Sequence, residues 1–232
     1  IRLGVPNKGR LNERAVELLI KSGIDIGEDW GRKLNVHAKN QDVEVLFLRA
    51  QDIPAFVDSG AIDMGITGED MVAESGYDIE KLADLRFGKC HLAIAAPEAA
   101  GLKNEHDIPE GSRIATSFPN ITRRYFDAIG KKVQIVEVTG AAEIMPYLGI
   151  SDMIADLVST GSTLKMNRLS EVCNILETQA AVFSSKASYK SKKAAIDDLI
   201  DAIISVIDAE DKKYIMANVP KDKLDEVNRI LP

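Results

Sequence analysis

An apolar run that ends in a turn of small and hydroxylated residues constrains the fold more than any other stretch of this chain. The run spans residues 153–158, the turn spans residues 159–163, and residues 164–169 are compatible with a helix. At the end of a parallel strand, a glycine-containing turn can direct backbone N–H groups, hydroxyls and a helix N-terminus at one anion. The stretch therefore predicts a phosphate site in an open α/β sheet. The alternative is a plain strand-to-helix turn capped by Ser and Thr.

Asp156, near the end of the apolar run, favours the phosphate site. A carboxylate just before an anion site is unfavourable unless it meets hydroxyl groups or a divalent cation. A phosphorylated sugar bound with Mg²⁺ would supply both. The turn residues that would line such a site are Ser159, Thr160, Gly161, Ser162 and Thr163.

Basic residues follow two other predicted strands. Residues 1–5 and 43–48 are the strands, Lys8 and Gly9 lie in the turn after the first, and Arg49 follows the second. Ligands bind at the carboxyl ends of the strands in open α/β sheets, so Lys8 and Arg49 are expected to face one crevice. The alternative is that these are ordinary charges of exposed turns.

Two acidic residues begin predicted helical segments. Gly68 and Asp70 follow a predicted strand at residues 62–66, and Glu143 opens a short helical stretch at residues 141–148. Asp70 either contacts a ribose or a metal, or only compensates the helix dipole from the first turn.

The sequence predicts two lobes. Its character changes near residues 85–89, where we expect the chain to cross into the second lobe, and it returns after an apolar run at residues 172–178. A long amphipathic helix is predicted at residues 194–209. The expected division is residues 1–88 with 178–211 for the first lobe, 89–177 for the second lobe with the phosphate loop, and 212–232 for the start of a further domain.

Composition limits the classes of partner. The chain has 232 residues, 45% of them apolar, with a net charge of −7, so its overall field favours neither nucleic acid nor an anionic membrane. Two widely separated cysteines indicate reduced thiols rather than a disulfide framework. No window approaches the ~20 apolar residues of a membrane helix and no signal segment opens the chain, so we expect a cytoplasmic protein.

Four motifs in register resemble the ATP phosphoribosyltransferases, the family of the first enzyme of histidine biosynthesis. They are Val5-Pro6-Asn7-Lys8-Gly9-Arg10-Leu11, Leu48-Arg49-Ala50-Gln51-Asp52-Ile53-Pro54, Asp63-Met64-Gly65-Ile66-Thr67-Gly68-Glu69-Asp70, and the stretch from Asp156 to Leu164 with Asn167. Gln51 stands where the family pattern has a second Arg, and Phe118 where Tyr is commoner. The resemblance covers essentially the whole chain.

The resemblance implies an α/β fold with two lobes like those of periplasmic binding proteins and an active site in the interlobe cleft. It also implies ATP and phosphoribosyl pyrophosphate as substrates, Mg²⁺ as cofactor, feedback inhibition by histidine, and assembly into dimers or hexamers. Residues 214–232, predicted as a strand and a helix, resemble the start of the C-terminal ferredoxin-like regulatory domain of longer members.

The resemblance also implies roles for the candidate residues. The turn 159–163 would bind the ribose phosphate, Asp156 the ribose hydroxyls, directly or through the metal, and Lys8 and Arg49 the pyrophosphate and the phosphates of ATP. Glu143 and Asp70 would contact ribose or adenine, or help to remove a proton from the adenine ring system. Gly9 and Gly68 belong to the substrate-binding turns.

The main alternative is a module that binds a solute or senses a ligand with the same two lobes and without catalysis. An export signal, a lipid-anchoring Cys or a fused DNA-binding segment would mark such a module, and we identify none of these in the sequence. A catalytically silent regulatory subunit is disfavoured because the phosphate loop is intact.

Overall fold

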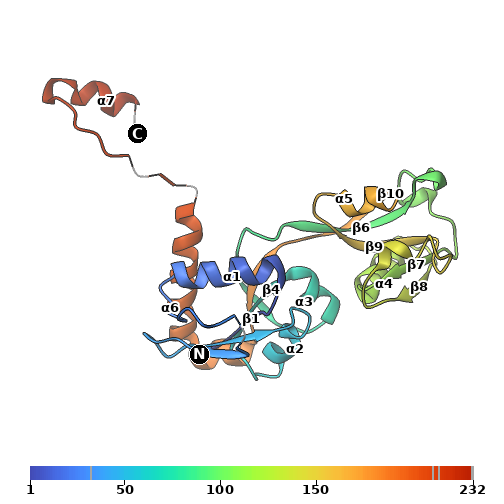
Figure 1. The fold of residues 1–232 in the computed structure, drawn as a ribbon, viewed down its shortest axis with the longest axis horizontal. Helices are drawn as coiled ribbons and strands as arrows, with labels where there is room; N and C mark the ends of the chain where they lie inside the picture. The colour runs from blue at the N-terminus through green and yellow to red at the C-terminus, as the bar shows by residue number, and fades with distance from the viewer. Residues whose placement is uncertain (32, 211, 214, 231–232) are drawn as a thin grey trace.

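The computed structural model describes residues 1–31, 33–210, 212–213 and 215–230. Two β-sheets form the centres of two lobes that lie side by side (Figure 1), as expected for a fold like that of periplasmic binding proteins. The first sheet has the order β2-β3-β1-β4-β11-β5 and the second has the order β10-β6-β9-β7-β8.

The first sheet is mixed. Strand β1 is parallel to β3 and β4, and β11 is antiparallel to β4 and β5. Its strands are β1 (Arg2–Pro6), β2 (Asn35–His37), β3 (Glu44–Leu48), β4 (Met64–Gly68), β5 (Glu80–Asp84) and β11 (Ala180–Ser184). Its helices are α1 (Gly9–Lys21), α2 (Ile53–Asp58), α3 (Glu69–Ser75) and α6 (Lys186–Glu210).

The second sheet joins a parallel half to an antiparallel half. Strand β9 is parallel to β7 and antiparallel to β6, and β8 and β10 form the edges. Its strands are β6 (Cys90–Pro97), β7 (Arg113–Thr116), β8 (Gln134–Glu137), β9 (Met153–Val158) and β10 (Leu169–Thr178). Its helices are α4 (Pro119–Ala128) and α5 (Ser162–Met166), with 3₁₀ turns η1 (Glu98–Ala100), η2 (Glu105–Asp107) and η3 (Ala142–Ile144).

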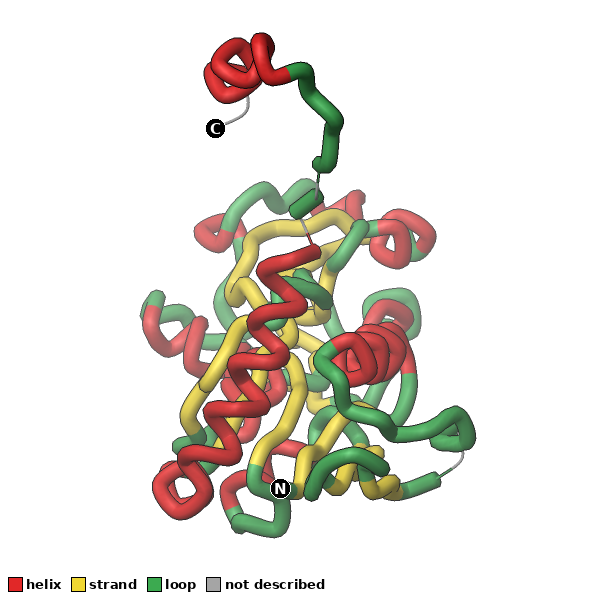
Figure 2. The backbone as a smooth tube through the Cα atoms, turned by 90° about the vertical axis from the view of Figure 1, so that its left-hand side faces the viewer, coloured by secondary structure: helices red, strands yellow, loops and turns green. Residues whose placement is uncertain are grey.

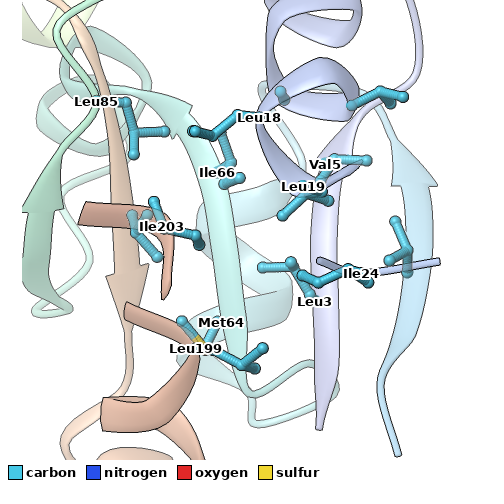
Figure 3. Close-up of a cluster of buried hydrophobic side chains, with 14 of the residues drawn as sticks. Leu3, Val5, Leu18, Leu19, Ile24, Met64, Ile66, Leu85, Leu199 and Ile203 are labelled. Atoms are coloured by element: carbon cyan, nitrogen blue, oxygen red, sulfur yellow. The ribbon is translucent and has the colours of Figure 1, made fainter. Parts of the chain in front are cut away.

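Apolar packing of α1 and α6 holds the first lobe together. Figure 3 shows Leu3 of β1, Leu19 of α1, Ile66 of β4 and Ile203 of α6 in one buried cluster. The apolar positions of α1 and α6 recur at helical spacing, so each helix presents one apolar stripe to the sheet. Figure 2 shows α6 running along the strands. The second lobe has its own buried clusters around β6, β7 and β9.

Two backbone connections join the lobes. The chain leaves the first sheet between β5 and β6, and it returns between β10 and β11. These connections are hydrogen-bonded to each other, since the Ala180 N–H donates to the Phe87 carbonyl at 3.0 Å. The two connections therefore lie side by side where the lobes join.

Several element boundaries differ from the predictions. The predicted helix at residues 194–209 is the second part of α6, which begins at Lys186 and has a non-helical conformation at Lys192 (φ −123°, ψ 25°). The predicted helix at 164–169 ends at Met166, because Leu169 already belongs to β10. The helical stretch predicted at 141–148 contains only η3.

The predicted strand at residues 214–219 is wrong where the structure describes it. Tyr214 lies outside the described residues, and residues 215–219 have no strand conformation and are mostly exposed. A strand needs a neighbouring strand to bind its backbone groups, and none pairs with this segment in the described part of the chain. The helix predicted after it is present as η4 (Lys221–Lys223) and α7 (Leu224–Ile230). Across the described residues, we find no helix with the length and apolar character needed to cross a membrane.

Candidate functional site

The turn after β9 has the geometry expected of an anion-binding loop. Gly161 has φ +70°, a left-handed conformation that favours glycine, and it is the residue before α5. Ser159, Thr160, Ser162 and Thr163 are all exposed. The Thr160 and Ser162 hydroxyls are hydrogen-bonded to each other at 3.0 Å. The loop thus presents several hydroxyls from one strand end.

A pocket of about 250 Å³ lies over this loop. Residues 156–164 form one wall, Glu143 of η3 contributes from the same lobe, and Arg10 comes from the first turn of α1 in the other lobe. The pocket is therefore shared by both lobes. The larger hollows of about 690, 590 and 430 Å³ are lined by first-lobe residues away from the carboxyl ends of its strands.

Two carboxylates give this pocket an unusual charge balance. Asp156 is partly buried, and its Oδ1 accepts a hydrogen bond from the Leu157 N–H at 2.8 Å. Burial raises the pKa of Asp156, the Leu157 N–H opposes that rise, and the charge of Glu143 adds to it. Arg10 is the cation that the lining contributes against these carboxylates. The arrangement therefore suits a ligand or an ion that brings positive charge or hydroxyl donors to Asp156.

The predicted basic turns lie at one edge of the first sheet. Pro6 of β1 pairs with Leu48 of β3, and the Asn7 N–H donates to the Leu48 carbonyl at 2.7 Å. Lys8 and Arg49, which follow these two strands, are both exposed. Because the ends of β1 and β3 are hydrogen-bonded together, Lys8 and Arg49 follow neighbouring strand ends at one edge of the first sheet. We call this edge the basic rim. Neither cation is among the residues that line the phosphate-loop pocket.

Glycine suits positions 9 and 68 for different reasons. Gly9 has φ +76°, and no atom would lie within 4 Å of an added Cβ. Gly68 has an ordinary φ of −71°, but an added Cβ would lie 2.1 Å from Oδ1 of Asp70. The first glycine serves the backbone conformation of the turn, and the second leaves room for a side chain.

Asp70 lies where the lobes join, outside the lining of the phosphate-loop pocket. It is buried, and the Thr178 hydroxyl donates to its Oδ1 at 2.8 Å. Burial raises its pKa, and the hydrogen bond from Thr178 opposes that rise. The structure therefore places Asp70 in a contact between the start of α3 and the end of β10.

Arg10 lines the pocket, although we assigned it no role of its own from the sequence. It lies two residues after Lys8 in the same basic turn, and sequence alone does not tell which of the two side chains reaches the other lobe. The position of Arg10 in the first turn of a helix that directly follows a strand end is the signal that could have identified it.

A family model identifies the chain. The model for ATP phosphoribosyltransferase matches residues 49–205, more than half of the sequence and most of both lobes. The chain belongs to the ATP phosphoribosyltransferase family. An ATP phosphoribosyltransferase from Methanothermobacter thermautotrophicus is 43% identical over 232 residues, which span 100% of this chain and 81% of the relative.

Solved structures support the same family and fold. The ATP phosphoribosyl transferase (HisG:HisZ) complex from Thermotoga maritima includes a chain with a TM-score of 0.80 and 29% identity, covering 90% of this chain and 100% of that one. The alkanesulfonate-binding protein of Xanthomonas axonopodis pv. citri has a TM-score of 0.55 and 15% identity, covering 90% and 73%. This second likeness shows the fold alone, so the solute-binding alternative is not favoured.

Membership of the ATP phosphoribosyltransferase family defines the chemistry. The enzyme is a glycosyltransferase that joins N1 of the adenine of ATP to C1′ of phosphoribosyl pyrophosphate and releases pyrophosphate. This is the first step of histidine biosynthesis. An enzyme of this class is consistent with a divalent metal.

Proposed function

We propose that the phosphate loop binds the ribose 5-phosphate of phosphoribosyl pyrophosphate and that Arg10 closes this site from the first lobe. The single observation that carries the proposal is the shared pocket, in which Arg10 meets residues 156–164. Hydroxyls and backbone N–H groups donate to phosphate oxygens, and a guanidinium binds phosphate with two parallel hydrogen bonds. Ser159, Thr160, Gly161, Ser162 and Thr163 form the cradle.

The basic rim of the first lobe serves the leaving group. Lys8 and Arg49 bind the pyrophosphate and the phosphates of ATP, and Gly9 and Gly68 belong to the turns that approach them. Negative charge grows on the pyrophosphate as the bond to C1′ breaks, so donors fixed at this rim lower the barrier. Holding the two anionic substrates in line supplies the rest of the rate enhancement.

Asp156 binds the ribose hydroxyls, directly or through Mg²⁺. Carboxylate oxygens suit Mg²⁺, and Asp156 and Glu143 are the two carboxylates of the pocket. No group of three or more metal-binding side chains occurs among the described residues, so substrate oxygens and water would complete the shell. When bound, the ion would neutralise charge on the leaving pyrophosphate. Glu143 contacts ribose or adenine, or accepts a proton from the adenine ring system.

Asp70 is a weaker candidate for substrate contact. Its hydrogen bond with Thr178 and its burial favour a structural role at the junction of the lobes. Contact with ribose or adenine would require this carboxylate to leave its partner.

The proposal includes the predicted division of the chain into two lobes and a further domain. Residues 1–88 with 178–211 act as one lobe, residues 89–177 as the other, and residues 212–232 as the start of a regulatory domain. The similar Thermotoga maritima chain is part of a complex of two proteins, HisG and HisZ. From the family resemblance, we propose that this enzyme assembles as a dimer or hexamer, is inhibited by histidine, and works in the cytoplasm.

The Arg10→Ala variant tests the shared site. Turnover is followed as phosphoribosyl-ATP formation with pyrophosphatase present to remove the product pyrophosphate. We expect kcat/KM for phosphoribosyl pyrophosphate to fall about 100-fold to 1,000-fold. Arg14→Ala is the matched control, because Arg14 lies one turn later on α1 and pairs with Glu17 at 3.0 Å. An Arg10→Ala enzyme within twofold of wild type would refute the assignment.

A further inference from the structure

Helix α4 lacks a cap from its own sequence. Pro119 occupies its first position, and Phe118 precedes it as the N-cap residue with no side-chain hydrogen bond. A phenylalanine side chain cannot accept a hydrogen bond, whereas the N–H groups of the first turn need acceptors. The N–H groups of Asn120 and Ile121 are the ones that a local N-cap side chain would normally serve.

Glu74 of the other lobe supplies the missing acceptors. Its Oε1 accepts from the Asn120 N–H at 2.8 Å, and its Oε2 accepts from the Ile121 N–H at 2.9 Å. Glu74 belongs to α3, between β4 and β5 of the first sheet, whereas α4 follows β7 of the second. One carboxylate therefore caps a helix across the junction between the lobes.

The reverse contacts come from α4. The Asn120 side-chain amide donates to the Glu74 carbonyl at 3.0 Å, and the Arg124 guanidinium donates to the Ala73 carbonyl at 2.6 Å. These carbonyls lie in the last turn of α3, where helix carbonyls have no partner within the helix. The C-terminus of α3 and the N-terminus of α4 thus complete each other, with favourable dipole ends in contact.

An apolar cluster lies beside this polar junction. Phe118 and Ile121 of the α4 segment are buried with Leu92 of β6, and Met71 and Ala73 of α3 pack against them. Helix α3 is therefore attached to the second lobe by both apolar packing and hydrogen bonds. A change in the angle between the lobes would have to disturb both.

The junction is connected to the strand that carries the phosphate loop through β7. Strand β7 leads to α4, and Thr116 at its end pairs with Ala155 of β9, the strand that carries the phosphate loop. The Thr116 hydroxyl accepts from the Phe118 N–H at 2.9 Å, which fixes the turn between β7 and α4. The orientation of α4 is thus coupled to the sheet that carries Asp156 and its loop.

We infer that Glu74 is a positioning residue that fixes the second lobe relative to the first, so that the phosphate loop meets the basic rim. This role rests on the proposed division of substrate contacts between the lobes. Glu74 itself lies outside the lining of the phosphate-loop pocket. It acts through α4 rather than on the substrates.

The Glu74→Gln variant tests the inference with two measurements. Amide hydrogen exchange in peptides covering residues 118–126 should accelerate at least tenfold without substrates, and saturating substrates should restore protection. The KM of at least one substrate should rise about tenfold while kcat changes less than threefold. Asp78→Asn is the control, because Asp78 is an exposed carboxylate just after α3 that pairs with Lys186 within the first lobe.

A second variant keeps the inference testable if Glu74→Gln folds poorly. Arg124→Met removes the bond to Ala73 from the other side. Lys132→Met is its control, because Lys132 is an exposed cation of the second lobe that follows α4. Arg124→Met should reproduce the exchange and KM changes, and Lys132→Met should not.

Three outcomes would overturn the inference. Exchange at residues 118–126 that matches wild type would show that the junction does not hold α4. Faster exchange with unchanged KM would reduce Glu74 to a local helix cap. Exchange that rises equally across both lobes would indicate general destabilisation. The proposed function is judged separately, by the Arg10→Ala kinetics.

Discussion

The Thr178 hydroxyl and the Asp70 carboxylate, 108 residues apart in sequence, form a buried hydrogen bond of 2.8 Å at the junction of the lobes. The same hydroxyl accepts from the Asp70 N–H at 3.0 Å. One side chain at the end of β10 therefore serves both the backbone and the side chain of the first turn of α3. This relationship leads to two predictions about stability.

The first prediction concerns Thr178→Val. The substitution keeps the shape of the side chain and removes the Thr178 donor from a buried carboxylate, so we expect a loss of about 1–3 kcal/mol in the free energy of unfolding. Urea unfolding at neutral pH measures it. A loss below about 0.5 kcal/mol, the usual range of surface substitutions, would mean that the contact contributes little.

The second prediction concerns the pH dependence of Asp70→Asn. Burial raises the pKa of Asp70 in the folded state, so its stabilising neutral form is present at low pH and is lost as pH rises through the folded pKa. The amide keeps an acceptor for Thr178 and cannot ionise. The stability of the variant relative to wild type should therefore increase as pH rises from about 4 to 7.

Asp152→Asn is the control of opposite sign for this pH experiment. Hydrogen bonds from Arg113 lower the pKa of Asp152. Its stabilising charge is present above its ordinary pKa and is lost as pH falls, so this variant should lose stability relative to wild type as pH rises. Parallel slopes for the Asp70 and Asp152 variants would contradict the role given to burial.

Gly68→Ala gives a third prediction. An added Cβ would lie 2.1 Å from Oδ1 of Asp70, although the φ of Gly68 suits any residue. We expect a loss of about 1–3 kcal/mol through overpacking. In the Asp70→Ala background the loss should largely disappear, because the two residues are coupled. Gly31→Ala, with no atom near its added Cβ, is the control.

The sequence predicted the parts of the site that are local. The apolar run 153–158, the hydroxyl-rich turn and Gly161 all lie within one strand-turn-helix unit, so their chemistry follows from neighbouring residues. Pro6 and Leu48 mark strand ends, and the general rule for open sheets brought Lys8 and Arg49 to one edge.

Contacts between distant segments were not predictable in the same way. Nothing near Phe118 in sequence indicates that Glu74, 46 residues before Asn120, caps α4. The break in α6 at Lys192 is another case: the Lys192 ammonium pairs with buried Asp63 at 2.8 Å, a partner 129 residues away. The apolar pattern from 196 onward identified only the part of α6 after this break.

The fourth prediction concerns Asp156→Asn, for which stability and activity should change in opposite directions. Burial raises the pKa of Asp156, so ionisation costs the folded state free energy at neutral pH. The amide should therefore raise the melting temperature at pH 7 and lose this advantage below about pH 4. Turnover should fall about 100-fold to 1,000-fold. A variant that is both less stable at pH 7 and fully active would contradict both expectations.

The last prediction concerns Gly161→Ala, which tests whether the left-handed backbone of the phosphate loop matters for substrate binding. The nearest atom to an added Cβ is Oε1 of Glu171 at 3.7 Å, an ordinary contact, so the cost is that of the positive φ, about 1–2 kcal/mol. If the loop relaxes to relieve this strain, its hydroxyls move, and the KM for phosphoribosyl pyrophosphate should rise about tenfold. Gly130→Ala is the matched control, because Gly130 has φ +68° with no atom near an added Cβ and follows α4 on the surface. Gly130→Ala should reduce the free energy of unfolding by a similar amount and leave KM unchanged. Equal KM values for the two variants would show that the left-handed conformation of the loop does not matter for substrate binding.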